Sequence, residues 1–359
     1  MKTSSLVVIA QNFLQNSVIE QIKPFGNGHI NDTYLVSLKN EKEEYILQKI
    51  NTTIFLDAEG LAKNHLLIQN HLKKEKKGAI ELAEIIPDTI GNYIFRTKEN
   101  EAWRMTSRIK EAYSIDLVEH NWQATEAGRA YGWFINALEG IDTSKLSEAI
   151  PNFHKLSFRI DQLNQAIDEN RAKRKEDVSD LLDFYKKREK QLVEIEEHVE
   201  NKEIPIRITH NDTKINNVLF RNTKAAAVID LDTVGPGIIF YDFGDALRTI
   251  ANKANEDEKD ISLVKINLDA YSNFSKGFLP QVKKVLSAKE KELIHLAPIL
   301  MTYIMGIRFL ADYLNGDIYY KIKYPEHNLV RTKVQMQLIS EFEANKNELI
   351  TIIHQYIHD

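Results

Sequence analysis

The side chains that could do chemistry gather in THNDTKINNVLF, residues 209–220. His210, Asp212 and Asn217 follow the pattern H-x-D-x-x-x-x-N, and Lys214 lies two residues after the aspartate. This spacing is typical of loops that catalyse phosphoryl transfer, in which the Asp carboxylate orients a hydroxyl and the Asn amide oxygen binds a metal ion. The Lys between them can meet the transferring phosphoryl group. We expect His210 to hold the loop by hydrogen bonds rather than act as a base.

A second acidic stretch, AAAVIDLD, spans residues 225–232. Asp230 and Asp232 are two residues apart and are expected to share one face of a strand. An unpaired carboxylate is costly to bury, so a cation should accompany them. Mg²⁺ prefers one or two carboxylates together with phosphate oxygens, so we predict a Mg²⁺ site made of Asn217, Asp230 and Asp232. The alternative is that both aspartates only close a turn. Asp242 is expected to be structural.

A glycine-containing turn near the N-terminus, FGNGHINDTYLV, lies between two predicted strands. Such a turn brings backbone N–H groups close to phosphates, which predicts contacts from Gly26, Asn27 and Gly28 to ATP. The plainer alternative is a tight turn without a ligand.

The next predicted strand, YILQKI, should carry a phosphate-contacting lysine. The pattern places Gln48 at that position with Lys49 beside it. Neighbouring side chains of a strand point to opposite faces, so only one of the two can serve. Glu59, on the following helix, is a possible partner.

The elements that position these residues divide at a connection near residues 106–111. Residues 1–107 read as a small α+β unit: a helix over 1–20, strands over 22–38, a helix over 55–76 with Asp57 as its N-cap, and a hairpin turning at 98–101. Residues 108–359 read as mainly helical. The predicted helices span 119–138, 159–170, 177–200, 257–274, 287–314 and 329–357. The charged stretch 168–203 is expected to be a solvated helical hairpin, with a partner-binding arm as the alternative.

Composition limits the partners and the compartment. The chain has 359 residues and a net charge of −5, which does not indicate a general affinity for nucleic acid or anionic membranes. The absence of cysteine excludes disulfides, thiolate catalysis and cysteine-based zinc sites. We saw no apolar run near the roughly 18 residues that span a bilayer. The sequence therefore predicts a cytoplasmic protein without an obligate protein partner.

Several further stretches carry a family resemblance. They include GNGHINDTYLV, YILQKIN, EAGRAYGWF, IPNFHKLSFR, VIDLDTVGPGIIFYDFGDALR and GIRFLADYLNGDIYYKIKYPEHNLVR. With the catalytic stretch, they make the chain resemble the aminoglycoside phosphotransferase and choline kinase superfamily, and within it the N-acetylhexosamine 1-kinases. The resemblance spans almost the whole chain. It implies an α+β, protein-kinase-like fold with a small β-rich N-lobe and a larger, mainly helical C-lobe.

The resemblance also implies roles for individual residues. Asp212 would orient and deprotonate the anomeric hydroxyl of an N-acetylhexosamine, which would receive the γ-phosphoryl group of ATP and become a sugar 1-phosphate. Asn217 and Asp230 would hold Mg²⁺, and Arg308 and Tyr319 would contact the sugar. A buried structural ion pair is the alternative for Arg308. The alternatives for function are another small-molecule kinase, acting on an aminoglycoside, choline or another sugar, and a catalytically silent nucleotide-binding scaffold.

Overall fold

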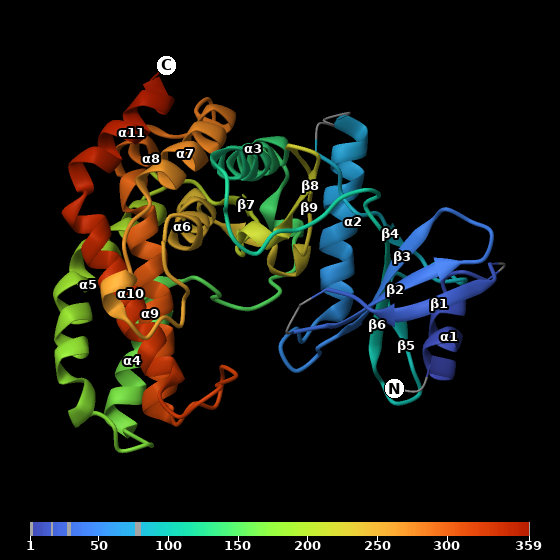
Figure 1. Cartoon of the computed structure of the whole chain (residues 1–359), viewed down its shortest axis with the longest axis horizontal. Helices are drawn as coiled ribbons and strands as arrows, with labels where there is room; N and C mark the ends of the chain where they lie inside the picture. Colours follow the sequence, from blue (N-terminus) through green and yellow to red (C-terminus); the bar gives the residue numbers. More distant parts are fainter. Residues whose placement is uncertain (1–2, 16, 27–29, 76–79, 359) are drawn as a thin grey trace.

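The computed structural model describes residues 3–15, 17–26, 30–75 and 80–358, which form a sheet lobe and a helical lobe (Figure 1). In this part of the chain, the sheet lobe holds six antiparallel strands in the order β1-β2-β3-β6-β4, and β5 also pairs with β6. The strands are β1 (Ile19–Pro24), β2 (Asp32–Leu38), β3 (Glu44–Ile50), β4 (Ile85–Ile86), β5 (Phe95–Arg96) and β6 (Ala102–Ser107).

The two faces of this sheet have different neighbours. One face packs Leu47, Trp103 and Met105 against α1 (Thr3–Gln11). The other face packs Ile50 and Ala102 against α2 (Ala58–Glu75), which lies between the sheet and the helical lobe (Figure 1). Because side chains alternate along a strand, residues 48 and 104 point to the α2 side, whereas residue 49 points to the α1 side. This alternation decides which polar side chains of the sheet face the helical lobe.

The helical lobe is built around one large apolar core. Its helices are α3 (Asn121–Ala137), α4 (Leu156–Glu169), α5 (Ser179–Glu200), α6 (Ile239–Ile250), α7 (Leu268–Val282), α8 (Ala288–Leu293), α9 (Ala297–Asn315), α10 (His327–Ala344) and α11 (Lys346–His358). Four short strands, β7 (Arg207–Thr209), β8 (Val218–Arg221), β9 (Lys224–Val228) and β10 (Gly235–Gly237), form two antiparallel pairs beside α3, at the side of the lobe that faces the sheet (Figure 1).

Helices α3 and α7 touch through backbone atoms. A Cβ atom on Gly128 would lie 2.2 Å from the carbonyl oxygen of Phe274, and one on Gly277 would lie 1.9 Å from the carbonyl oxygen of Thr125. Both distances are too short for any side chain, so glycine at these positions allows the helices to approach closely.

Several predicted elements are confirmed, and Asp57 accepts the backbone N–H of Gly60 at 2.8 Å as an N-cap would. Three predicted boundaries are wrong. The predicted helix over 1–20 ends at Gln11, because β1 begins at Ile19 and pairs with β2. The predicted helix over 257–274 begins only at Leu268, where the Asn267 side chain caps it. The predicted helix over 329–357 is two helices that separate at Asn345.

The charged stretch 168–203 is only partly a solvated arm. Its long helix, α5, buries Leu181, Tyr185, Leu192 and Ile195 in the core of the helical lobe.

The segment Ala288–Asn315 is, in the described part of the chain, the one stretch long and apolar enough to cross a membrane, which corrects the expectation that none approaches that length. Of its apolar window, 78% is buried within the lobe.

Candidate active site

The loop after β7 is fixed from behind by a buried carboxylate. Asp242, on α6, is fully buried and accepts the backbone N–H groups of His210 and Asn211, each at 2.8 Å. The Thr213 hydroxyl donates to the Asp242 carbonyl at 2.7 Å. Burial raises the pKa of Asp242 to about 6, although the two N–H donors favour its charged form. The structural role expected for Asp242 agrees with these contacts.

His210 is also structural, as the sequence predicted. It is fully buried, and its Nε2 donates to the Ile229 carbonyl at 2.9 Å. Its ring packs edge-on against Tyr131 and Phe134, with centroids 5.5 and 5.7 Å away. The histidine thereby joins the catalytic loop to the segment that follows β9.

Asp212 is held at both carboxylate oxygens. Lys214 Nζ lies 3.0 Å from Oδ1, and Asn217 Nδ2 lies 3.2 Å from Oδ2 and 2.9 Å from the Asp212 carbonyl oxygen. Burial alone would raise the pKa of Asp212, but the nearby Lys214 ammonium more than reverses this, and the pKa is lowered. The carboxylate is therefore ionised at neutral pH and can accept a hydrogen bond, and then a proton, from a substrate hydroxyl.

Two possible metal ligands, Asn217 and Asp230, lie on adjacent backbone segments, because the Asn217 carbonyl accepts the N–H of Ile229 at 2.9 Å. Because the amide nitrogen of Asn217 binds Asp212, its oxygen is directed elsewhere and makes no hydrogen bond within the described residues. Asp230 has a left-handed backbone, with φ of 61°, and the residue is exposed. Desolvation by the surrounding protein, together with repulsion from the charges of Asp232 and Asp212, raises the pKa of Asp230 to about 7. Carboxylates that crowd together in this way are stabilised by a divalent cation, so Asn217 and Asp230 fit a metal ion.

The described residues contain no cluster of three or more His, Asp, Glu or Cys side chains placed to hold a metal by themselves. A metal at Asn217 and Asp230 would therefore need phosphate oxygens as further ligands. This requirement matches the habit of Mg²⁺ in nucleotide sites, where it binds few protein groups.

The sequence predicted that Asp230 and Asp232 share one face of a strand. This prediction is wrong. Strand β9 ends at Val228, and Asp232 lies in the following 3₁₀ turn, Leu231–Thr233. The left-handed conformation of Asp230 turns the chain, and the carboxylate of Asp232 forms a buried ion pair with Arg104 of β6. Because both carboxylate oxygens of Asp232 already bind Arg104, we leave Asp232 out of the proposed metal ligands.

On β3, the structure places Gln48 and Lys49, the two candidates for a phosphate contact, on opposite faces of the sheet. Gln48 lies on the α2 side and accepts a hydrogen bond from Arg104 Nε at 3.0 Å. Lys49 lies on the α1 side, where its ammonium contacts Glu101 at 2.5 Å. Lys49 therefore points to the opposite face from Gln48 and Arg104, and its ammonium is already paired, so Gln48 is kept as the candidate phosphate contact on this strand.

Two other expectations at this end have different outcomes. Glu59 is not the partner of either β3 residue, because both its oxygens bind Arg96 at 2.7 Å. Gly26 has a φ of 76°, and a Cβ there would meet nothing within 4 Å, so the turn leaves open space beside its backbone. Asn27 and Gly28 lie outside the described residues, and their contacts to ATP stay predictions.

Arg308 has no carboxylate partner within the described residues, so the alternative of a buried ion pair is wrong. Its guanidinium lies 5.2 Å from the ring centroid of Phe153 and 5.7 Å from that of Tyr320, and Nη1 is 3.4 Å from the sulfur of Met305. Tyr319, 60% exposed, is held through its backbone N–H by Asp312 at 2.8 Å. These side chains leave a cation and aromatic rings available to a ligand.

His154, which sequence reasoning missed, connects this group to the catalytic loop. Its buried ring lies 4.2 Å from that of Phe153, and its Nε2 donates to the Asn211 carbonyl at 2.8 Å. Burial lowers the pKa of His154 to about 3; the charge of Arg308 lowers it further, while that of Asp212 opposes the change. Contacts therefore run from Arg308 through the rings of Phe153 and His154 to Asn211, which precedes Asp212.

Arg159 adds a second cation that the sequence did not indicate. It is buried on α4, donates to the Phe153 carbonyl at 2.6 and 3.1 Å and contacts Gln162 at 2.7 Å. Burial, with the repulsion of Arg308 added, lowers the pKa of Arg159 to about 10. The only signal in the sequence analysis was its place at the end of the stretch IPNFHKLSFR, which was quoted for the family resemblance without a role for the arginine.

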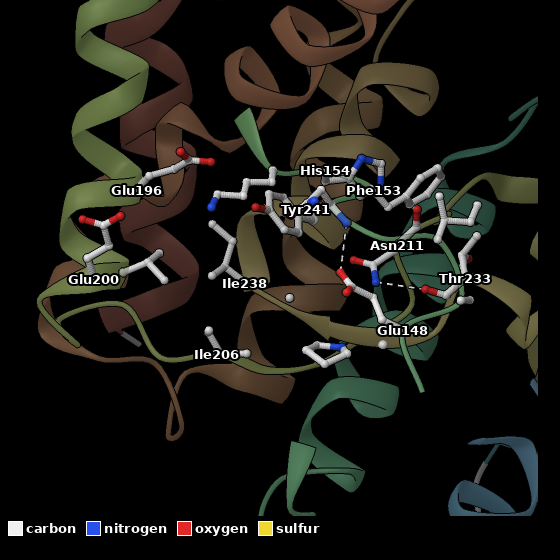
Figure 2. Close-up of a pocket in the computed structure, with 18 residues that line it drawn as sticks. Glu148, Phe153, His154, Glu196, Glu200, Ile206, Asn211, Thr233, Ile238 and Tyr241 are labelled. Atoms are coloured by element: carbon white, nitrogen blue, oxygen red, sulfur yellow. Dashed lines mark hydrogen bonds between the residues drawn. The ribbon is translucent and has the colours of Figure 1, made fainter. Parts of the chain in front are cut away.

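A cavity of about 320 Å³ lies along the flank of the catalytic loop (Figure 2). Glu196 and Glu200 of α5 stand on one side, and His154, Asn211 and Thr233 on the other. Glu196 is occupied as a cap, since it accepts the N–H of Leu156 at 2.6 Å. Arg308 does not line this cavity, whereas Phe153 and His154 do. The cavity is therefore a neighbour of the Arg308 site and not the same space.

Comparison with known proteins now bears on this arrangement. Residues 21–280 match the sequence profile described as the phosphotransferase enzyme family. The chain belongs to this family. The match contains the sheet lobe from residue 21 onward, the loop that carries Asp212 and the segment that carries Asp230. Membership in this family makes the chain a phosphotransferase.

Solved structures show the same fold. An aminoglycoside phosphotransferase from Alicyclobacillus acidocaldarius has a TM-score of 0.61 at 10% identity, covering 97% of this chain and 96% of the other. A choline kinase from Cryptosporidium parvum has 0.58 at 15%, covering all of both chains. A ternary complex of an aminoglycoside phosphotransferase with streptomycin and ATP has 0.56 at 12%, covering 98% and 99%. The predicted α+β, two-lobed, kinase-like fold is confirmed.

Proposed function

We propose that this phosphotransferase transfers the γ-phosphoryl group of ATP to the anomeric hydroxyl of an N-acetylhexosamine and releases a sugar 1-phosphate. The observation that carries the proposal is the guanidinium of Arg308. It lacks a carboxylate partner in the described residues, lies between the rings of Phe153 and Tyr320, and neighbours the catalytic loop through His154. A guanidinium can donate to an acetamido carbonyl or to hydroxyls, and aromatic rings pack against the C–H face of a sugar.

The charge of this region favours a neutral acceptor over a cationic one. Arg308 and Arg159 are close enough to depress the pKa of Arg159, and the described residues give neither one a carboxylate. An ammonium group placed beside them would be repelled. Aminoglycosides and choline carry such a group, whereas an N-acetylated hexosamine does not. The alternative of an aminated acceptor is therefore disfavoured by electrostatics.

The chemistry assigned to this chain is mainly positioning. Asp212, ionised and held by Lys214 and Asn217, would accept a hydrogen bond from the anomeric hydroxyl and take its proton as the oxygen attacks the γ-phosphorus in line. An anomeric hydroxyl is more acidic than an ordinary alcohol, so a carboxylate with a low pKa suffices. Lys214, with its charge beside Asp212, would face the phosphoryl group as negative charge spreads over its oxygens.

Asn217 and Asp230 would hold Mg²⁺. Bound there, the ion would supply positive charge that neutralises part of the negative charge of the phosphates. Gly26 and Gln48 are proposed to face the nucleotide, since Gly26 has a backbone conformation suited to a tight turn and Gln48 lies on the same sheet face as Arg104, which contacts the segment that carries Asp230. Asp232 and Lys49 are left out of the proposed set because both already have ionic partners.

An acceptor panel tests the proposal. ADP release is measured with ATP, Mg²⁺ and each of N-acetylglucosamine, N-acetylgalactosamine, glucose, glucosamine, choline and streptomycin, with Asp212→Asn as the blank. We expect turnover with an N-acetylated hexosamine and a product whose phosphorus couples to the anomeric proton in NMR spectra. Turnover with choline or streptomycin instead would establish the first alternative. Nucleotide binding without turnover of any acceptor would point to a silent scaffold.

A further inference from the structure

The ion pair between Arg104 and Asp232 joins the two lobes at the site. Arg104 belongs to β6 of the sheet lobe, and Asp232 follows Asp230 by two residues in the helical lobe. Both guanidinium nitrogens Nη1 and Nη2 bind the carboxylate, with Nη2 at 2.9 Å from Oδ2. The two side chains are only 5% and 3% exposed. Such two-pronged pairing fixes orientation as well as distance.

Two further side chains of the sheet lobe extend this pair. Asn31 Nδ2 donates to Asp232 Oδ2 at 2.7 Å, and its Oδ1 accepts the Asn51 N–H at 2.9 Å. Gln48 accepts from Arg104 Nε at 3.0 Å and donates to Thr33 Oγ1 at 3.1 Å. Asp232 is therefore bound by the segment that follows the glycine turn as well as by β6.

The lysine–glutamate ion pair that is usual in the small lobe of protein kinases is not formed by the corresponding residues, Lys49 and Glu59. In protein kinases, a lysine on the third strand pairs with a glutamate on the following helix. In this chain Lys49 pairs with Glu101, and Glu59 pairs with Arg96, so each of these pairs joins parts of the sheet lobe to each other. The buried link runs instead from the sheet to the segment that carries Asp230.

We propose that Arg104, Asp232, Asn31 and Gln48 form an interlobe latch that positions the nucleotide-binding turn against the proposed metal-binding segment. Asp232 acts in it as a positioning residue that fixes the backbone beside Asp230. In a protein kinase, the strand lysine pairs with a glutamate of the same lobe. Here the corresponding cation is Arg104, and its partner is a carboxylate of the other lobe. The inference rests on the proposed nucleotide and metal site and is independent of the acceptor.

The test compares two binding affinities that need no acceptor. ADP affinity is measured by calorimetry in EDTA, and Mn²⁺ affinity by electron paramagnetic resonance in the presence of saturating ADP. The variants are Arg104→Met, Asp232→Asn, their double variant and Asp230→Asn. Arg96→Met is the matched control, since it removes an arginine–glutamate pair that lies within the sheet lobe.

We expect Arg104→Met and Asp232→Asn each to weaken ADP binding about tenfold, and the double variant to be no weaker than the worse single variant, because both remove one shared interaction. Arg96→Met should bind ADP like the wild type. Mn²⁺ affinity should fall far more in Asp230→Asn, which removes a proposed ligand, than in Asp232→Asn, which only loosens the backbone beside it. A double variant that loses about a hundredfold, as additive effects require, would overturn the latch.

A second variant guards against misfolding of Arg104→Met. Arg104→Lys keeps the charge but offers a single ammonium in place of the fork, so it should recover part of the ADP affinity. Wild-type affinity in Arg104→Lys, or an equal loss of Mn²⁺ affinity in Asp232→Asn and Asp230→Asn, would also overturn the proposal. Because no acceptor is used, an error in the proposed sugar would leave all these results unchanged.

Discussion

Replacing Asp242 with asparagine should separate the stability of this phosphotransferase from its activity. The carboxylate of Asp242 accepts two backbone N–H groups of the catalytic loop, at 2.8 Å each, inside the helical lobe. Asparagine has the same shape, but only its oxygen can accept. Its amide nitrogen would face the second N–H group, so one hydrogen bond is lost and the loop must shift.

The expected change in stability is small because two effects oppose each other. The pKa of Asp242 is raised to about 6 in the folded chain, against about 4 for an exposed aspartate. A shift of about two units means that ionised Asp242 costs the fold roughly 3 kcal/mol at neutral pH. Asparagine removes this cost but forfeits a charge-assisted hydrogen bond of roughly 1.5–3 kcal/mol. The free energy of unfolding at pH 7 should therefore change by no more than about 2 kcal/mol.

The same shift sets the sign of the pH dependence. Because the folded pKa lies above the unfolded one, the folded state binds the proton more tightly. The contribution of Asp242 to the free energy of unfolding is therefore fully present below about pH 4 and is lost as the pH rises through about 6. Asp242→Asn should remove this component from the stability–pH curve.

The expected change in activity is large. A displacement of about 1 Å at a reacting group can lower a rate roughly a hundredfold, so kcat should fall between about tenfold and a hundredfold. Urea unfolding gives the stability and steady-state ADP release gives kcat. Asp142→Asn is the control, since Asp142 also accepts a backbone N–H, from Ser144, but on the surface. Wild-type kcat in Asp242→Asn, or a loss of stability well above about 2 kcal/mol, would refute this reasoning.

Three further predictions follow from the same structure. Asp212→Asn should lower kcat by about 10²- to 10⁴-fold while calorimetry shows wild-type ATP affinity. Near-normal turnover would show that Asp212 is not the catalytic base. Arg308→Ala should raise the acceptor KM by about 10- to 100-fold and leave the ATP KM unchanged, whereas equal effects on both would count against a sugar role. Gly128→Ala should lower the free energy of unfolding by about 1–3 kcal/mol in urea titration, because its methyl group meets the Phe274 carbonyl; unchanged stability would show that α3 and α7 can separate at no cost.

The catalytic loop was the most predictable part of the site. Asp212, Lys214 and Asn217 lie within six residues, so one short bend fixes their geometry, and their contacts at 3.0 and 3.2 Å follow from that spacing. The large helices were predictable for a similar reason, since a periodic apolar face is a local property of the sequence.

Residues brought together from distant parts of the chain were not predictable. Arg104 and Asp232 are 128 positions apart, and His154 and Asn211 are 57 apart, so no spacing rule links either pair. The strand assumed to carry both Asp230 and Asp232 ended early because Asp230 adopts a left-handed conformation, which an aspartate tolerates but does not announce. Sequence periodicity therefore predicted that Asp232 faces the metal site, whereas in the structure its carboxylate pairs with Arg104.

The most direct test of the site is the position of the metal ion. Crystals grown with Mn²⁺ and a non-hydrolysable ATP analogue would give an anomalous signal at the ion. The account predicts a peak in contact with Asn217 Oδ1, the Asp230 carboxylate and the phosphate oxygens, with the Asp212 carboxylate facing the γ-phosphate and Asp232 still bound to Arg104. A peak elsewhere, or a nucleotide whose γ-phosphate lies away from Asp212, would contradict it.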